Sequence, residues 1–220
     1  LAGPDVELDG ASFDSRSIAR GQLFVPIVAE RDGHEFIPDA LARGAAAYLT
    51  QHEHVGGTAI CVDDTLNALM RLARWSREQW GAEDPHRRVI GITGSVGKTS
   101  TKDLAVAALA ACTSAYANER SFNNDQGLPT TILNAPADTR VMILEMGMRG
   151  FGEIARLCEI ALPHVGIVTR VAAAHTERVE SIMGVARAKS ELIEALPDNG
   201  AAILNGDDDL VRGMRARTFA

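Results

Sequence analysis

The second half of the sequence alternates short apolar runs with stretches of helical periodicity. The apolar runs VIGIT, VMILEM, HVGIVTR and AAILN occupy residues 89–93, 141–146, 164–170 and 201–205. Strands that are apolar along their whole length are usually buried on both faces, and the intervening helices supply the cover. The pattern therefore predicts an α/β fold with a mostly parallel sheet. In such sheets, ligands bind beyond the carboxyl ends of the strands.

A shorter strand and helix pattern precedes this sheet. QLFVPIV at residues 22–28 is typical of a buried strand, and a helical stripe follows over residues 32–44. The later segment GAEDPHRR, residues 81–88, is polar, contains proline and has no periodicity. We therefore expect two domains, a small α/β domain over residues 1–82 and a sheet-containing domain over residues 83–220.

The composition argues against several kinds of partner and location. The 220 residues carry a formal net charge of −7 without a run of like charges, so we expect no nucleic-acid partner. No apolar run approaches the roughly 18 residues of a membrane span, and the first residues lack a secretion-signal pattern. Three scattered cysteines, Cys61, Cys112 and Cys158, indicate reduced, buried thiols. These features together predict a cytoplasmic protein.

The stretch VIGITGSVGKTS, residues 89–100, nearly matches the phosphate-binding loop G-x-x-x-x-G-K-[ST]. Ile92 stands where the pattern has its first glycine. The context of strand, glycine-rich turn and helix still suits a phosphate, because backbone N–H groups and a helix N-terminus converge there. The alternative is a glycine-rich helix start with an exposed lysine. We expect nucleotide contacts from seven consecutive residues: Gly94, Ser95, Val96, Gly97, Lys98, Thr99 and Ser100.

Two further polar residues follow apolar strands. Glu145 ends VMILEM, where a carboxylate beside a phosphate loop is well placed to hold Mg²⁺. It could instead cap the following turn or helix. His175 comes shortly after HVGIVTR and so belongs to the same edge of the sheet, although an isolated loop histidine is seldom a ligand.

Lys189 interrupts an apolar stripe. In SIMGVARAKSELIEAL, residues 181–196, Ile182, Ala186, Ile193 and Leu196 share one helical face with Lys189 at its centre. A charge there is unfavourable, and burial lowers the pKa of a lysine. The alternative is a lysine whose stem crosses apolar surface to reach water.

The chain resembles the Mur ligases, the ATP-dependent amide-bond-forming enzymes of peptidoglycan synthesis. T-G-x-x-G-K-T-S is the form that the phosphate loop takes in this family. Residues 11–49 are similar to its N-terminal UDP-binding domain. TKDL, SFNNDQGLPTTIL, LEMGMRGFGEI, AAAHTE and ARAKSEL then follow in order. These motifs are most similar to the member that adds D-alanyl-D-alanine.

The resemblance implies a monomeric ligase that joins D-alanyl-D-alanine to UDP-N-acetylmuramoyl-tripeptide through an acyl phosphate. ATP and two Mg²⁺ ions are the implied cofactors. Thr99, Glu145, His175 and Lys189 are the implied metal ligands, Lys189 as a CO₂-derived carbamate. Lys98, Lys189 and His175 are the implied catalytic residues.

The resemblance also assigns two groups of residues to the substrate. Asn123 and Asn124 would lie beside the sugar-peptide, although asparagines before GLP are equally suited to a turn. Asp14, Ser15 and Arg16, with the DGH of residues 32–34, match the UDP-binding domain. Taken alone they would be surface polar residues.

The chain has roughly half the length of the family members, so we expect the end of the ATPase domain and the C-terminal domain to be absent. Two alternatives therefore remain open: the sister ligase that adds the third amino acid, and a nucleotide-binding fragment without catalysis. A GTPase or kinase is disfavoured because the guanine motif N-K-x-D is missing.

Overall fold

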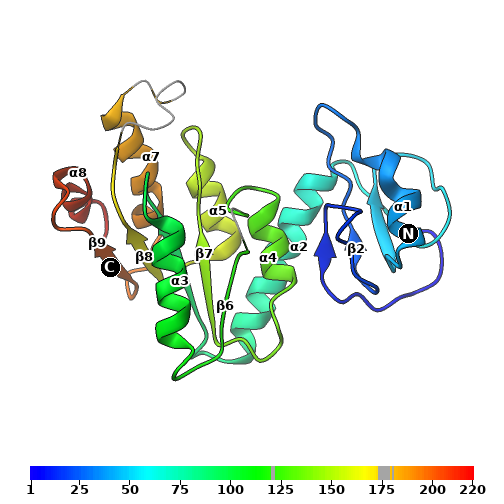
Figure 1. Ribbon diagram of the computed structural model, residues 1–220, viewed down its shortest axis with the longest axis horizontal. Coiled ribbons are helices and arrows are strands. Elements are labelled where there is room, and N and C mark those ends of the chain that lie inside the picture. The colour runs from blue at the N-terminus through cyan, green and yellow to red at the C-terminus, as the bar shows by residue number, and fades with distance from the viewer. Residues whose placement is uncertain (120–121, 173–178, 180) are drawn as a thin grey trace. The chain divides into compact units, whose positions relative to one another are not determined.

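The computed structural model describes residues 1–119, 122–172, 179 and 181–220. The chain divides into two compact units, Leu1–Ala73 and Arg74–Ala220. Each unit has its own parallel sheet (Figure 1).

The first unit is a small α/β layer. Its sheet has the order β1-β2-β3-β4, formed by Ala11–Ser12, Leu23–Phe24, Ala47–Thr50 and Ala59–Cys61, and every pairing is parallel. The 3-10 helix η1 (Gly33–Phe36) and helix α1 (Ile37–Ala42) connect β2 to β3. Phe24, Tyr48 and Ile37 are buried in its apolar core. The strand predicted at residues 22–28 is therefore real but shorter.

The second unit contains a sheet of order β6-β7-β5-β8-β9, again with every pairing parallel. Its strands are β5 (Arg88–Thr93), β6 (Ala115–Ala117), β7 (Val141–Glu145), β8 (Val165–Val168) and β9 (Ala201–Leu204). This confirms the predicted α/β fold. The sequence pattern missed β6, which has too few residues to show a periodicity.

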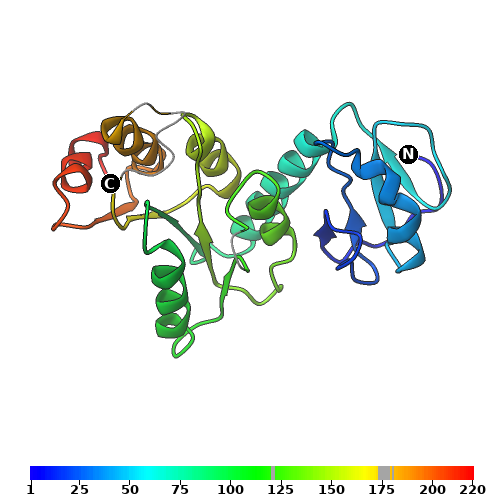
Figure 2. The same cartoon turned by 45° about the horizontal axis from the view of Figure 1, so that its top comes forward.

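Helices cover both faces of this second sheet. The helices are α3 (Lys98–Leu109), α4 (Gly127–Leu133), α5 (Glu153–Ala161), α7 (Ile182–Glu194) and α8 (Asp209–Arg212), and a 3-10 turn, η2 (Gly213–Arg217), follows. Figure 2 shows α3 on one face of the sheet and α5 and α7 on the other. The central strands are consequently buried, as their continuous apolar sequences predict.

The division between the units falls inside helix α2 (Thr65–Glu83), earlier than the boundary expected at residues 82–83. The second half of α2 bonds to the second unit. Arg77 Nε donates to the carbonyl of Ala161 at 2.9 Å, and Trp80 Nε1 donates to the carbonyl of Thr139 at 3.1 Å. These contacts are long-range, so the local polarity of residues 81–88 could not reveal them.

The cysteines differ from expectation. All three are free thiols, and Cys158 is buried, but Cys61 and Cys112 are exposed. Cys61 ends the edge strand β4 and Cys112 follows α3, so their apolar neighbours in sequence do not enclose them. Burial raises the pKa of the Cys158 thiol to about 12, which makes it unreactive.

In the part of the chain that the structure describes, none of the helices combines the length and the apolar character needed to cross a membrane.

Candidate functional site

The glycine-rich loop lies at the carboxyl end of β5, as predicted. Gly94 has φ +153°, and a Cβ there would collide with Thr169 Oγ1. Gly97, with φ +85°, is the residue immediately before α3. Gly91 is an interior residue of β5, where a Cβ would lie 2.8 Å from Leu192 Cδ1. The loop therefore turns on Gly94 and Gly97, and Gly91 instead allows α7 to pack closely on the sheet.

The segment that follows β8 fixes the shape of the loop. Ser95 N donates to the carbonyl of Arg170 at 2.7 Å, and Ser95 Oγ donates to the carbonyl of Ala172 at 3.0 Å. Thr169 Oγ1 donates to the carbonyl of Val96 at 2.7 Å. These bonds preorganise the backbone around the N-terminus of α3, which favours an anion.

Lys98 is the first residue of α3, and its ammonium is folded back over the loop. Lys98 Nζ donates to the carbonyl of Gly94 at 2.9 Å. This position matches the lysine of a phosphate-binding loop. Among the other predicted contact residues, Val96 and Ser100 have exposed side chains beside the same helix start.

Glu145 is the last residue of β7 and is only 2 % exposed. Thr99 Oγ1 donates to its Oε2 at 2.8 Å, and Asn123 Nδ2 donates to its Oε1 at 2.7 Å. The alternative capping role is not observed, because the N-terminus of α5 is capped instead by Glu191, which accepts from Gly152 N at 2.8 Å.

The oxygen atoms of Thr99 and Glu145 suit a divalent cation. Within the described ranges, the buried carboxylate of Glu145 forms no ion pair, although a buried charge normally requires one. A hydroxyl and a carboxylate beside a phosphate loop are the ligand types that Mg²⁺ takes. The residues present therefore fit this ion.

Lys189 lies on the buried face of α7, as its sequence position predicts. It is 3 % exposed, and Ala186, Ile193 and Leu196 are buried with it, whereas Ile182 is exposed. Burial, and then the nearby charge of Lys98, lowers the pKa of Lys189 to about 8. The stem does not carry the ammonium out to bulk water, because the whole residue is buried in the wall of a pocket.

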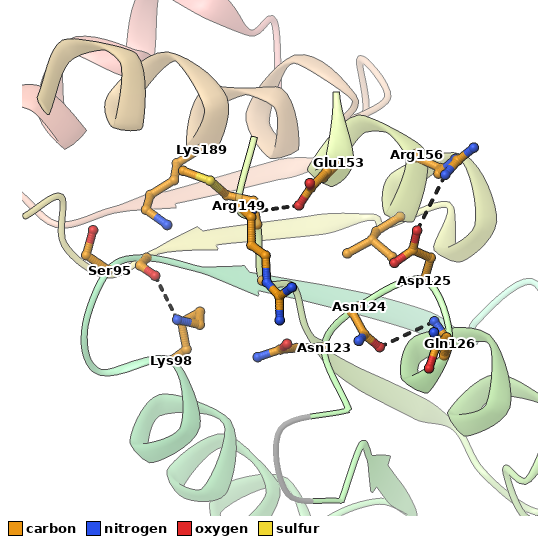
Figure 3. Close-up of a pocket in the computed structure, with 14 residues that line it drawn as sticks. Ser95, Lys98, Asn123, Asn124, Asp125, Gln126, Arg149, Glu153, Arg156 and Lys189 are labelled. Atoms are coloured by element: carbon orange, nitrogen blue, oxygen red, sulfur yellow. Dashed lines mark hydrogen bonds and ion pairs between the residues drawn. The ribbon is translucent and has the colours of Figure 1, made fainter. Parts of the chain in front are cut away.

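One pocket of about 480 Å³ brings these elements together (Figure 3). Its wall includes Lys98, Lys189, Asn123 and Asn124, all of which the sequence analysis selected. The sequence analysis missed eight further wall residues: Asp125, Gln126, Gly147, Met148, Arg149, Glu153, Arg156 and Leu157. Six of them belong to the motifs SFNNDQGLPTTIL and LEMGMRGFGEI, a signal that does not distinguish wall residues from turn residues. Arg156 and Leu157 lie just beyond the second motif and had no such signal.

Two arginines of this wall differ in their partners. Arg156 forms an ion pair with Asp125 at 3.4 Å. Arg149 is held through its backbone, because Glu153 Oε2 accepts from Arg149 N at 2.7 Å. Within the described part of the chain, the guanidinium of Arg149 has no partner, and Figure 3 shows it extending into the pocket. Arg149 is thus available to an anionic ligand.

The two asparagines have different environments. The side-chain Nδ2 of Asn123 donates to Glu145 Oε1, and the backbone carbonyl of Asn123 accepts from Gly147 N at 2.8 Å. Asn124 Oδ1 accepts from Gly127 N at 2.9 Å, which closes the turn before α4. Asn124 thus closes a turn and also lines the pocket, and Asn123 is the asparagine bonded to the carboxylate of Glu145. The remaining predicted residue, His175, lies outside the described residues.

Asp14, Ser15 and Arg16 belong to the first unit and follow β1 after one intervening residue, Phe13. Asp14 Oδ2 accepts from Arg16 Nη2 at 2.8 Å, and this contact lowers the pKa of Asp14. The guanidinium of Arg16 is largely exposed, whereas Ser15 is buried.

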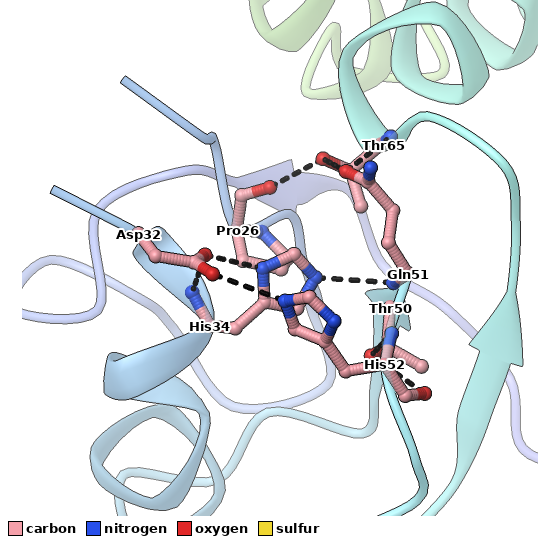
Figure 4. A network of polar contacts seen from close by, with 7 residues as sticks. All are labelled: Pro26, Asp32, His34, Thr50, Gln51, His52 and Thr65. Atoms are coloured by element: carbon pink, nitrogen blue, oxygen red, sulfur yellow. Dashed lines mark hydrogen bonds and ion pairs between the residues drawn. The ribbon is translucent and has the colours of Figure 1, made fainter. Parts of the chain in front are cut away.

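A second polar cluster occupies the carboxyl ends of β2 and β3 in this unit (Figure 4). Asp32 Oδ1 lies 2.5 Å from His34 Nδ1, and Asp32 Oδ2 lies 3.0 Å from His52 Nε2. His34 Nε2 accepts from Gln51 N at 3.1 Å, so the neutral ring carries its proton on Nδ1 and donates to Asp32. Both ring nitrogens of His34 are therefore in use, which disfavours a metal ion at this cluster.

Comparison with known proteins assigns the fold and the loop to a family. The family profile described as "Mur ligase middle domain" matches residues 92–219, which contain most of the second unit and its pocket. The chain belongs to the Mur ligase family. The resemblance inferred from the motifs is thereby confirmed.

Similar proteins carry names within the Mur ligase family. The UDP-N-acetylmuramoyl-tripeptide–D-alanyl-D-alanine ligase of Bacillus subtilis is 38% identical over 96% of this chain and 47% of its own length. The crystal structure of MurF from Acinetobacter baumannii has a TM-score of 0.87 at 29% identity, covering 97% of this chain and 47% of that one. MurF of Thermotoga maritima in complex with ADP has a TM-score of 0.81 at 31% identity, covering 95% and 48%. The chain thus spans about half the length of the curated relatives that it matches.

Proposed function

We propose that this Mur ligase chain forms part of an ATP-dependent enzyme that joins D-alanyl-D-alanine to UDP-N-acetylmuramoyl-tripeptide in the cytoplasm. The observation that carries the proposal is one pocket in which the loop lysine Lys98, the buried Lys189 and Asn123 meet. The names of the relatives, and the ADP complex of one of them, support the choice of substrates.

The phosphates of ATP bind over the loop at the N-terminus of α3, where the backbone N–H groups of Val96 to Thr99 are the donors, since Ser95 N is already bonded to the carbonyl of Arg170. Lys98 exchanges its bond to the Gly94 carbonyl for the β- and γ-phosphates. Thr99 and Glu145 hold the cation, which supplies charge neutralisation on the γ-phosphate.

Lys189 is the proposed site of a carbamate. Since its pKa is lowered to about 8, a sizeable fraction of the side chain is a neutral amine near neutral pH. The amine nitrogen bonds to the carbon of CO₂ and releases one proton to solvent. The product is a carboxylate-like ligand on the same side of the pocket as Lys98, where a second cation is required to balance it. His175 is the proposed third partner of this ligand set.

The chemistry proceeds by two displacements. The terminal carboxylate of the tripeptide attacks the γ-phosphorus of ATP, which forms an acyl phosphate and releases ADP. The amine of D-alanyl-D-alanine then attacks the acyl carbon and displaces phosphate, losing one proton. Phosphoryl transfer depends mainly on positioning and charge stabilisation. Lys98 stabilises the transferred group, and Arg149, whose guanidinium extends into the pocket, binds an anionic group of the tripeptide.

The first unit is the proposed site for the uridine nucleotide. Ser15 and Arg16 follow β1 and so lie at a strand end, where ligands bind in parallel sheets, and the Asp32–His34 cluster ties the loop after β2 to the end of β3. Asn123 and Asn124 face the sugar-peptide from the pocket of the second unit.

Calorimetry with the 220-residue chain tests nucleotide binding. We expect ADP to bind in the presence of Mg²⁺ and the affinity to fall when Mg²⁺ is chelated. A full-length enzyme carrying this chain should consume ATP with D-alanyl-D-alanine and not with a diamino acid. The opposite preference would assign the chain to the sister ligase, and an absence of nucleotide binding would contradict the proposal altogether.

A further inference from the structure

Lys102 is a buried cation with no role in the proposed chemistry. It lies on α3, is 5 % exposed, and its Nζ donates to the carbonyl of Asn118 at 2.7 Å. Lys102 Nζ also lies 3.4 Å from Asp103 Oδ1, but the side chain of Asp103 is largely exposed. Burying an ammonium is costly unless it is well paired. The Asn118 carbonyl is the principal acceptor that the described residues offer to it.

Asn118 is a connection point at the end of β6. It is 1 % exposed, and its Oδ1 accepts from Glu145 N at 2.9 Å. Its Nδ2 donates to the carbonyl of Phe122 at 3.0 Å. The side chain of Asn118 therefore holds two backbone positions at once. One is Glu145, the last residue of β7, and the other is Phe122, the residue directly before Asn123.

These two anchored points are joined again through functional side chains. Asn123 Nδ2 donates to Glu145 Oε1 at 2.7 Å, and Thr99 Oγ1 donates to Glu145 Oε2 at 2.8 Å. Thr99 and Lys102 are three residues apart on α3, so they lie on neighbouring turns of one face. A closed ring results, which runs from Thr99 along α3 to Lys102, then through Asn118 to Glu145 and back.

We propose that Lys102 and Asn118 are positioning residues that hold the Glu145 carboxylate and the Asn123 amide beside the phosphate-binding loop. The positioning role itself rests on the contacts above. Its expected effect on cation affinity rests on the proposed function. Lys102 fixes the Asn118 backbone, and Asn118 fixes both partners of the Asn123–Glu145 bond. Since groups that orient metal ligands affect metal affinity nearly as strongly as the ligands, the pair sets the affinity of the cation site.

The first test observes the Asn123 side-chain amide directly and needs no ligand. In the ¹⁵N-labelled 220-residue chain, its signal is assigned by its loss in Asn123→Ser. We expect it to move toward the position of a free amide in Lys102→Met and Asn118→Ala. It should stay in place in Leu104→Ala, a matched change at an exposed position of α3. An unchanged signal in the two folded test variants would overturn the proposal.

Two further variants keep the proposal testable if Lys102→Met or Asn118→Ala fails to fold. Asn118→Asp keeps an oxygen for Glu145 N but removes the donor to the Phe122 carbonyl, so the Asn123 signal should still move. Lys102→Gln is close in size and uncharged but too short to reach Asn118, so it should reproduce the effect of Lys102→Met. If the signal stays in place in either folded variant, the proposal is wrong.

The second test measures Mn²⁺ binding to the chain with ADP by electron paramagnetic resonance. Lys102→Met should weaken Mn²⁺ binding about tenfold, but less than about twofold when Glu145→Gln is already present. Equal losses in both backgrounds would indicate a purely structural lysine and would overturn the proposal. If the wild-type chain bound no Mn²⁺ with ADP, the proposed function would fail, and the Asn123 signal would still decide the positioning role.

Discussion

The two units both gather polar side chains at the carboxyl ends of parallel strands, but they use them differently. In the first unit, Asp32, His34 and Gln51 satisfy one another, with every ring nitrogen of His34 engaged. In the second unit, Lys189 and Arg149 face a pocket and have no side-chain bond among the described residues. A satisfied network stabilises its own fold, whereas unsatisfied cations around a cavity indicate an anionic ligand. The following predictions test that difference.

The largest effect is expected at Lys189. In a full-length enzyme carrying this chain, Lys189→Arg should reduce ligation about 100-fold or more, because a guanidinium keeps the charge but cannot form a carbamate. Depletion of CO₂ should slow the wild type and leave the residual rate of the variant unchanged. Carbon-13 bicarbonate should give a carbamate signal only in the wild type. A variant with near-normal rate would show that Lys189 is merely a buried lysine.

Lys98 should come next. Lys98→Met removes a charge-assisted bond to phosphate, worth about 1.5–3 kcal/mol, so calorimetry should show ADP affinity reduced roughly 10- to 100-fold. Arg43→Met, which removes one exposed positive charge from the first unit, is the matched control and should leave the affinity unchanged. Equal losses in the two variants would mean that only net charge matters.

Arg149 tests whether the pocket recognises an anionic substrate. Arg149→Ala should raise the KM for UDP-N-acetylmuramoyl-tripeptide about tenfold in a full-length enzyme, with the KM for ATP little changed. Arg149→Lys should recover part of the loss because it restores the charge. If the KM values for the two substrates rose together, Arg149 would belong to the nucleotide site.

Lys189 also makes stability depend on pH. Its folded pKa is about 8, below the value of about 10.5 for a free lysine, so between these pH values the unfolded chain binds more protons. Relative to Lys189→Met, the wild type should be destabilised below pH 8 and should recover on the order of 1 kcal/mol or more by pH 10.5. Urea unfolding at a series of pH values measures this difference. If the unfolding free energies of the wild type and Lys189→Met changed in parallel with pH, the lowered pKa of Lys189 would be contradicted.

The smallest effect is expected in the first unit. The backbone N–H of His34, and then the rings of His34 and His52, lower the pKa of Asp32. Asp32→Asn should therefore cost no more than about 1 kcal/mol of unfolding free energy at neutral pH. The cost should be fully present above about pH 4, the unfolded pKa, and should decline as the pH falls from there through the lowered folded pKa. ADP binding should be unaffected. A large loss of ADP affinity would show that the comparison between the units is mistaken.

Several features of the site could be predicted because their signals are local. Gly94 to Thr99 form one contiguous motif, Glu145 ends an apolar strand, and Lys189 interrupts a helical stripe. Each depends on a periodicity or spacing of a few residues, which secondary structure converts directly into position. The alternation of strands and helices likewise implied a parallel sheet.

The sequence by itself determined the α/β class, the edge of the sheet at which the glycine-rich loop lies and the residues that follow each strand. Only the tertiary structure decided the strand order β6-β7-β5-β8-β9, which puts Glu145 beside the loop after β5. It also decided that Arg149 extends into the pocket and that Asn118 bonds to the backbone of Glu145. These contacts join residues far apart in the chain, and their geometry depends on how helices pack on the sheet. No local pattern encodes that packing, because many polar residues on loops share the same composition and only those that packing brings together can act as one site.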